Sequence, residues 1–137
     1  MKLGQIYCVV LILALAFGLS NAWTWWDHEP GKKKFVRIVN QLDNGHVLNF
    51  RCQSKNDDLG VHSLAVNQQY EFHFRINVWG TTLFFCHLWY LDRSVRFDAF
   101  KADQEWFAEC DGDHCIWNAR ESGIFLGEKG EYVWGKN

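Results

Sequence analysis

Cys86 and His87 are the most tempting pair of side chains for nucleophilic chemistry in this chain. A hydrolase needs a nucleophile, a base and a group that orients the base. Neighbours on one strand point to opposite faces, however, so a thiol and an imidazole at these positions cannot meet. The serines outside the N-terminal stretch all lie in turn-like contexts, without the strand–elbow–helix motif of a serine hydrolase. The sequence therefore predicts no enzyme, no catalytic residue and no cofactor.

The cysteines indicate disulfides rather than a metal site. Cys8 lies in an apolar N-terminal stretch, which leaves an even set at Cys52, Cys86, Cys110 and Cys115. In a small secreted domain such a set is typical of two disulfides, and three pairings are possible. A zinc site would use His114, between Cys110 and Cys115, but zinc fingers usually show two close pairs of ligands. Cys52 and Cys86 are far apart in sequence, so we favour disulfides.

Two acidic pairs could offer oxygen ligands to calcium, Asp57-Asp58 and Asp111-Gly112-Asp113. An EF-hand loop needs a longer spaced set that ends in glutamate, and neither segment has it. Aspartates in such contexts more often bond to nearby backbone N–H groups in turns. We therefore expect no metal.

The dominant period of the chain is two, which is typical of strands with one buried face. Tyr70, Phe72, Phe74 and Ile76 alternate with polar residues. Strands are expected at 35–39, 48–52, 70–76, 82–90, 95–99, 115–120, 124–126 and 132–134. The strand at 82–90 is nearly all apolar, so we expect it to be central and buried on both faces. A short helical turn is conceivable only at 101–109. The pattern predicts an all-β fold, a small antiparallel β-sandwich of about seven or eight strands.

The first residues predict export. Lys2 precedes an almost unbroken apolar run from 6 to 17, and small residues at Ser20 and Ala22 fit a signal-peptidase site. The run is too short for a spanning helix of about 20 residues. We expect a cleaved signal peptide at 1–22, a flexible N-terminus at 23–34 and one domain at 35–137, in a secreted protein that is not membrane-integral.

Charge excludes some partners. Loss of Lys2 takes the net charge from −2 to −3. A weakly acidic chain with scattered signs predicts no nucleic-acid partner.

Several segments, in order, resemble the plant self-incompatibility S1 family, the S-protein homologues. They are VRIVNQL at 36–42, LNFRCQSKNDDLG at 48–60, WGTTLFFC at 79–86, CIW at 115–117 and ESGI at 121–124. The resemblance runs from about residue 35 to 126. One departure is that Glu121-Ser122-Gly123 replaces the more usual Asp-Gly step.

The resemblance implies a secreted β-sandwich with two disulfides, which acts as a ligand in cell–cell signalling of the self-incompatibility type. Its partner would be a cell-surface receptor protein on another cell. For the disulfides we expect Cys52 with Cys115 and Cys86 with Cys110, which avoids a bridge between cysteines only five residues apart.

Two long polar segments, 53–67 and 101–114, are flanked by these cysteine strands and are the expected contact loops, since rigid strands usually carry recognition loops. The predicted partner-binding residues are Lys55, Asn56, Asp57, Asp58, Asp103, Glu105, Asp111 and Asp113.

The eight tryptophans suggest an alternative function, a secreted carbohydrate-binding or defence module. Tryptophans beside apolar strands are more often core, which we expect for Trp79, Trp89, Trp106 and Trp117. The N-terminal residues Trp23, Trp25 and Trp26 precede every predicted strand, and an exposed aromatic trio would be a contact site.

Overall fold

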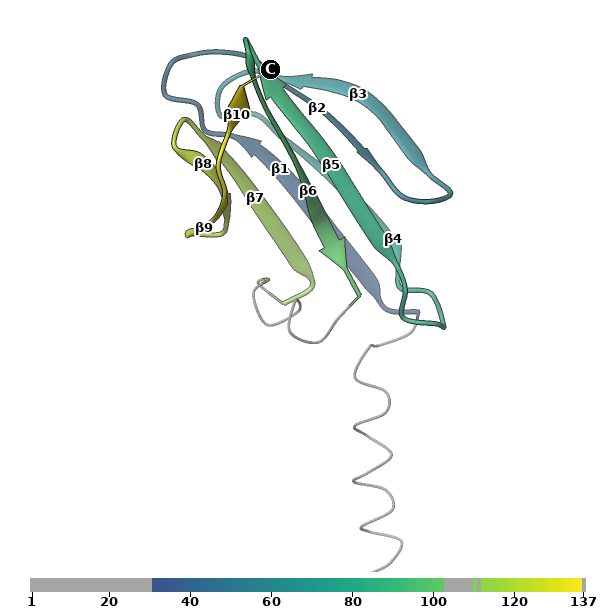
Figure 1. The fold of residues 1–137 in the computed structure, drawn as a ribbon. Coiled ribbons are helices and arrows are strands. Elements are labelled where there is room, and N and C mark those ends of the chain that lie inside the picture. The colour runs from purple at the N-terminus through teal and green to yellow at the C-terminus, as the bar shows by residue number, and fades with distance from the viewer. Residues whose placement is uncertain (1–30, 103–109, 111, 137) are drawn as a thin grey trace, which may run out of the picture.

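A computed structural model describes residues 31–102, 110 and 112–136 of the chain. The described residues form two five-stranded β-sheets packed face to face, and they contain no helix (Figure 1). In spatial order, sheet A contains β4 (Gln69–Arg75), β1 (Lys33–Asn40), β7 (His114–Arg120), β8 (Gly123–Leu126) and β9 (Lys129–Tyr132). Sheet B contains β10 (Gly135–Lys136), β6 (Arg93–Lys101), β5 (Leu83–Tyr90), β2 (Leu48–Gln53) and β3 (Asp58–Leu64).

The core lies between the sheets because most strands alternate apolar and polar residues. In β1, Val36 and Ile38 are fully buried, whereas the alternating residues Phe35, Arg37 and Val39 are partly exposed. Trp117 of sheet A is also fully buried, and its indole N–H donates to the carbonyl oxygen of Ala99 in sheet B at 2.9 Å. Its ring lies 4.7 Å from that of Phe97. Burial of such rings between two sheets is the main stabilising contribution expected for this fold.

The predicted all-β sandwich with two disulfides is confirmed, with differences in detail. The described residues contain ten strands rather than seven or eight, and β1 and β7 run parallel in an otherwise antiparallel fold. The strand β3 was not predicted. Of the expected strand at 132–134, only Tyr132 lies in a strand, as the last residue of β9, and β10 begins at Gly135.

Strand β5 is the central strand of sheet B, as predicted, but only one of its faces is buried. Phe84, Cys86 and Leu88 point into the core. On the other face Leu83 and Phe85 are 36% and 39% exposed. The expectation of burial on both faces is therefore wrong, because sheet B has no layer outside it among the described residues.

The predicted disulfide pairing is also wrong. The bonds are Cys52–Cys86, with a Cα–Cα distance of 4.1 Å, and Cys110–Cys115, at 4.7 Å. Cys52 and Cys86 are direct register partners on the neighbouring strands β2 and β5. Cys115 lies in the other sheet, beside β1. The chain turns between 110 and 115, so a bridge across five residues forms within the usual Cα separation.

The predicted flexible N-terminus at 23–34 ends too late. Strand β1 begins at Lys33, and Lys34 is only 3% exposed, with its Nζ 2.9 Å from an Oδ1 of Asp113. Residues 23–30 and most of the segment at 101–109 lie outside the described residues, whereas Lys101 ends β6. The part of the chain that the structure describes contains no helix long and apolar enough to cross a membrane.

Candidate functional site

One end of the sandwich brings a turn from the expected contact segment 53–67 next to a second turn that was not among the expected contacts, and we call it the loop end. It comprises the β2–β3 turn at 54–57 and the β4–β5 segment at 76–82 (Figure 1). A cleft of about 770 Å³ lies between these turns and the adjoining ends of β4 and β5. Its lining residues are Ser54, Lys55, Asn56, Asp57, His73, Phe74, Arg75, Asn77, Thr81, Thr82, Leu83, Phe84 and Phe85.

The β2–β3 turn holds three of the predicted contact residues at this cleft. The amide of Ser54 donates to the carbonyl of Asp57 at 2.7 Å, and the amide of Asp57 donates to the Ser54 hydroxyl at 3.1 Å. These two bonds close the turn and leave the side chains of Lys55, Asn56 and Asp57 at the cleft. The turn thus presents a cation, an amide and a carboxylate side by side.

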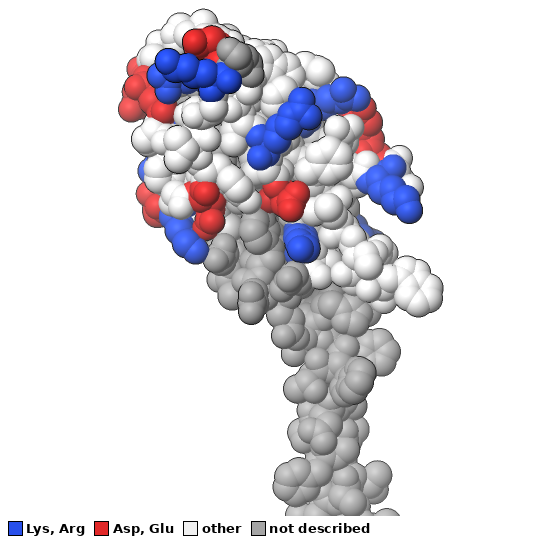
Figure 2. Space-filling view, in the orientation of Figure 1, with Lys and Arg blue, Asp and Glu red and all other residues white. Residues whose placement is uncertain are grey.

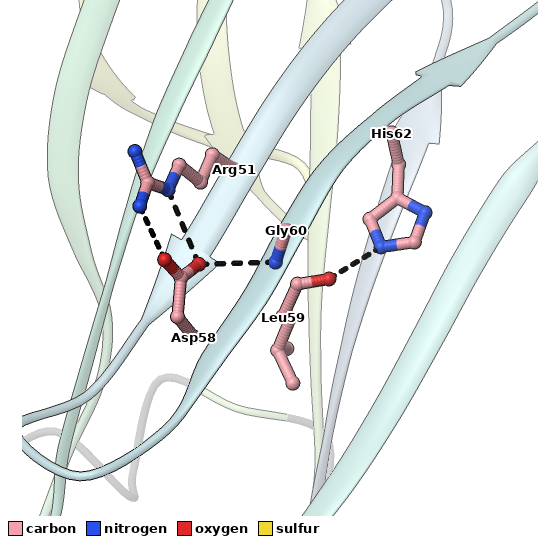
Figure 3. A network of polar contacts seen from close by, with 5 residues as sticks. All are labelled: Arg51, Asp58, Leu59, Gly60 and His62. Carbon is pink, nitrogen blue, oxygen red and sulfur yellow. Dashed lines mark hydrogen bonds and ion pairs between the residues drawn. The ribbon is translucent and has the colours of Figure 1, made fainter.

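Asp58, the next predicted contact residue, is engaged within the hairpin itself (Figure 3). The Arg51 guanidinium binds both carboxylate oxygens, with Nε 3.1 Å from Oδ1. The amide of Gly60 donates to the same Oδ1 at 3.0 Å. The Arg51 and Gly60 hydrogen bonds lower the pKa of Asp58 to about 2. This carboxylate therefore fixes the hairpin and does not line the cleft.

A hydrogen-bonded turn on the other side of the cleft presents an exposed tryptophan. The Asn77 side chain accepts from the amide of Thr81 at 2.9 Å and donates to its hydroxyl at 2.9 Å, and the amide of Asn77 donates to the hydroxyl of Thr82. At the tip of this turn Trp79 is 83% exposed, beside Val78 at 70%. An aspartate or asparagine side chain that bonds the backbone ahead of it is a common way to hold such a turn.

The expectation that Trp79 belongs to the core is wrong. Trp79 lies in the turn at 77–80, and a side chain at the tip of a turn has no facing layer to bury it. By contrast, Trp117 is fully buried as expected, and Trp106 lies outside the described residues. The signal that could have found Trp79 was its position inside that turn rather than its closeness to the apolar run after it.

The remaining predicted contact residues are not in the cleft. Asp113 binds Lys34 at 2.9 Å and lies 3.4 Å from the Nζ of Lys32, and its pKa is lowered chiefly by the hydrogen bond from Lys34. It precedes β7, two strands away from β4 in sheet A. Asp103, Glu105 and Asp111 lie outside the described residues.

The side chains considered for catalysis and metal binding are placed elsewhere. Cys86 is oxidised in a disulfide, and His87 lies on the opposite face of β5. The ring of His114 stacks on that of Phe35 at 4.4 Å, and both neighbouring cysteines form a disulfide with each other. Within residues 31–102, 110 and 112–136, no three His, Cys, Asp or Glu side chains come together in a way that could hold a metal ion.

Comparison with known proteins agrees with this architecture. Residues 35–136 match the family model of plant self-incompatibility protein S1. S-protein homolog 3 of Arabidopsis thaliana is 37% identical over 95% of this chain and 87% of its own length. S-protein homolog 5 of the same plant is 30% identical over 98% of this chain and 99% of its own.

A solved structure of an SPH (self-incompatibility protein homologue) protein shares the fold. It has a TM-score of 0.59 and 18% identity, and the match covers 78% of this chain and 97% of that one. The SPH proteins are described there as a widespread family of small, highly stable, secreted proteins from plants. The secreted localisation that residues 1–22 predict for this chain is the one stated for that family. The chain belongs to the plant self-incompatibility protein S1 family.

Proposed function

We propose that the protein is a secreted ligand in cell–cell signalling, which a cell-surface receptor protein binds at the loop end, and that it acts without catalysis. Trp79 is the central contact in this proposal, and Lys55, Asn56 and Asp57 contribute polar contacts across the cleft. The family to which the chain belongs supports a receptor partner.

The observation that carries the proposal is the exposure of Trp79 on a turn whose conformation is already fixed. Tryptophan is enriched among residues that dominate binding energy, because it buries a large area with few rotatable bonds. The hydrogen bonds of Asn77 hold the turn in one conformation before binding, so less entropy is lost on association. Contact with a partner would remove this 83% exposed indole from water, which is favourable for so large an apolar surface.

The cleft supports the same site because its lining includes Asn77 and Thr81, whose hydrogen bonds hold the Trp79 turn, together with other polar groups. Lys55, Asp57 and Arg75 line it together with Phe74 and Phe85. The guanidinium of Arg75 donates to the carbonyl of Gly31 at 2.9 Å, so this cation is held in place. A hydrophobic anchor beside a rim of polar groups is the usual composition of a protein–protein contact.

The proposal is tested by binding of the labelled mature protein to protoplasts, whose walls have been removed. Trp79→Ala should weaken saturable binding by about 2 kcal/mol, or roughly thirtyfold, while Trp79→Phe should recover part of it. Leu91→Ala is the matched control, because Leu91 is 69% exposed in the β5–β6 turn at the opposite end of the sandwich. Equal binding by the Trp79→Ala and Leu91→Ala variants, with unchanged melting temperatures, would place the receptor contact elsewhere.

The alternative function, carbohydrate binding or defence through Trp23, Trp25 and Trp26, rests on residues outside the described part of the chain. It stays a hypothesis for that segment.

A further inference from the structure

The outer face of sheet B carries side chains in rows, because register partners on antiparallel strands lie side by side. One row crosses four strands and consists of Val61, Arg51, His87 and Arg96. The next row on one side contains Asn49 and Trp89, and the next on the other side contains Gln53, Phe85 and Asp98. Along β5 the outer face therefore reads Phe85, His87, Trp89.

Two arginines flank His87 on the strands beside it. Arg51 and Arg96 are the register partners of His87 on β2 and β6, so their backbones are two strand spacings apart, about 10 Å. Arg51 is bound by Asp58, whereas Arg96 is exposed and has no carboxylate partner among the described residues. Burial is the larger of two causes that lower the pKa of His87, and the positive charge of Arg96 is the smaller. The central side chain of this row is therefore held toward its neutral form, and the positive charge beside it that lacks a carboxylate partner among the described residues is that of Arg96.

Aromatic rings lie on either side of that position along the strand. Phe85 is 39% exposed, and Trp89 is half-buried with its ring 4.8 Å from that of His87. Phe85 and Trp89 are four positions apart on the strand, a distance of about 13 Å. Along β5 the outer face therefore presents a ring, then His87 with Arg96 on the neighbouring strand, then a second ring.

The overall charge of the face is opposite to that of the chain. Its cations are Arg51, Arg96 and Lys101, and its carboxylates are Asp58 and Asp98, an excess of one positive charge in a protein of net charge −2. Figure 2, which looks at the sheet B side, shows a largely uncharged surface with separate basic and acidic groups rather than one strongly charged patch. The face suits a ligand that combines apolar surface with spaced negative charges.

We propose that this outer face binds a linear acidic polysaccharide, a chain of linked uronic acids. Each pyranose unit of such a polymer has an apolar C–H face, which stacks on an aromatic ring, and one carboxylate. Arginine pairs with carboxylates through two parallel hydrogen bonds. Phe85 and Trp89 would hold sugar faces while Arg96 binds the carboxylate of a unit between them.

The spacing of the two rings along the strand favours this ligand. A polymer that lies along β5 can place two of its apolar faces on Phe85 and Trp89, about 13 Å apart, and the carboxylate of a unit between them at Arg96. This surface is also distinct from the cleft at the loop end, apart from Phe85 and Leu83, which border both.

The test is titration of the mature protein with a linear, de-esterified oligogalacturonate, followed by calorimetry. The control ligand is the same oligomer with its carboxylates methyl-esterified, which removes the charge and keeps the sugar. Arg96→Gln should weaken binding of the acidic oligomer about tenfold, and the esterified oligomer should bind at least tenfold more weakly than the acidic one. Phe85→Ala should also weaken it severalfold.

The matched control variant is Arg37→Gln, which removes one cation from the outer side of sheet A, where Arg37 binds Glu71. It should change the affinity less than twofold.

Three outcomes would overturn the proposal: no saturable binding, equal affinity for acidic and esterified oligomers, or equal weakening by the Arg96 and Arg37 variants. Concentration-dependent dimerisation that Arg96→Gln abolishes would also overturn it, in favour of a second copy. Trp79→Ala should leave oligomer binding unchanged, and Arg96→Gln should leave protoplast binding unchanged, so the two proposals fail separately.

Discussion

Replacement of Asn40 by alanine should lower the free energy of unfolding by more than the lost side-chain volume alone would. Asn40 is fully buried at the end of β1. Its side-chain amide donates to the carbonyls of Leu64 at 2.9 Å and His46 at 3.0 Å, and its side-chain oxygen accepts from the amide of Leu42 at 2.9 Å. One side chain thus joins the β1–β2 connection to the end of β3, across the two sheets.

The magnitude follows from the groups that Asn40→Ala leaves without a partner. The bonds to Leu64 and Leu42 are buried, so each lost bond leaves a buried backbone group unpaired at a cost of about 1–3 kcal/mol. His46 is only half-buried and can bond to water instead. The sum is about 4 kcal/mol, a large share of the roughly 5–15 kcal/mol by which small domains are stable. For a domain of about this size that loss lowers the melting temperature by roughly 15 °C or more.

The assay is thermal and urea unfolding of the oxidised mature protein, with Asn44→Ala as the matched control. The Asn44 side chain also accepts a backbone hydrogen bond, from the amide of His46 at 3.0 Å, but in an exposed turn. Its loss should cost about 1 kcal/mol or less, because water replaces the bond. If the two alanine variants unfold within about 1 kcal/mol of each other, the reasoning from buried unpaired groups is refuted.

Two further predictions concern the backbone of β8 and the Arg51–Asp58 pair. Gly123→Ala should lower the free energy of unfolding in urea by about 3 kcal/mol, because Gly123 has a φ of +152° and a Cβ there would collide with the carbonyl oxygen of Tyr132. The control is Gly127→Ala, where φ is +60° and no atom lies near, and it should cost about 1 kcal/mol. Equal losses in the two variants would contradict this reasoning. Asp58 has its pKa lowered from 3.8 to about 2 in the folded protein, so its ionised form contributes stability above about pH 4 and that contribution is lost as the pH falls toward 2. The difference in melting temperature between the wild type and Asp58→Asn should therefore shrink over this interval, and a difference that stays constant from pH 5 to 2 would show that the pair adds nothing.

The strands with clean alternation were predictable because burial on one face imposes a period of two on the sequence. The segments 35–39, 48–52 and 70–76 all lie within or overlap observed strands. Strand β3 was missed because it is an edge strand, with only Leu64 fully buried and Val61 62% exposed, so little in its sequence alternates. Its Asp-Leu-Gly start also favours a turn, and Asp58 does bond to the amide of Gly60, two residues on, within the strand.

The disulfide pairing and the faces of β5 could not be predicted, because both depend on which strands are neighbours. Cys52 and Cys86 pair because β2 and β5 are adjacent in register, a fact that no local pattern encodes. An apolar run like that of β5 is typical of a strand buried on both faces, yet here its outer face remains exposed. The same features that misled the prediction, Phe85 and Trp89 on β5 and Trp79 in its preceding turn, are those on which the two proposed binding surfaces rest.

The loop-end contact is tested most directly by photo-crosslinking on living protoplasts. A photoreactive benzoylphenylalanine replaces Trp79 in one variant and Leu91 in another, and excess unlabelled protein serves as the competitor. The proposal predicts a crosslink from position 79 to a protoplast surface protein that the competitor abolishes, and no such crosslink from position 91. A competed crosslink from position 91 and none from position 79 would contradict the assignment of the receptor contact to the loop end.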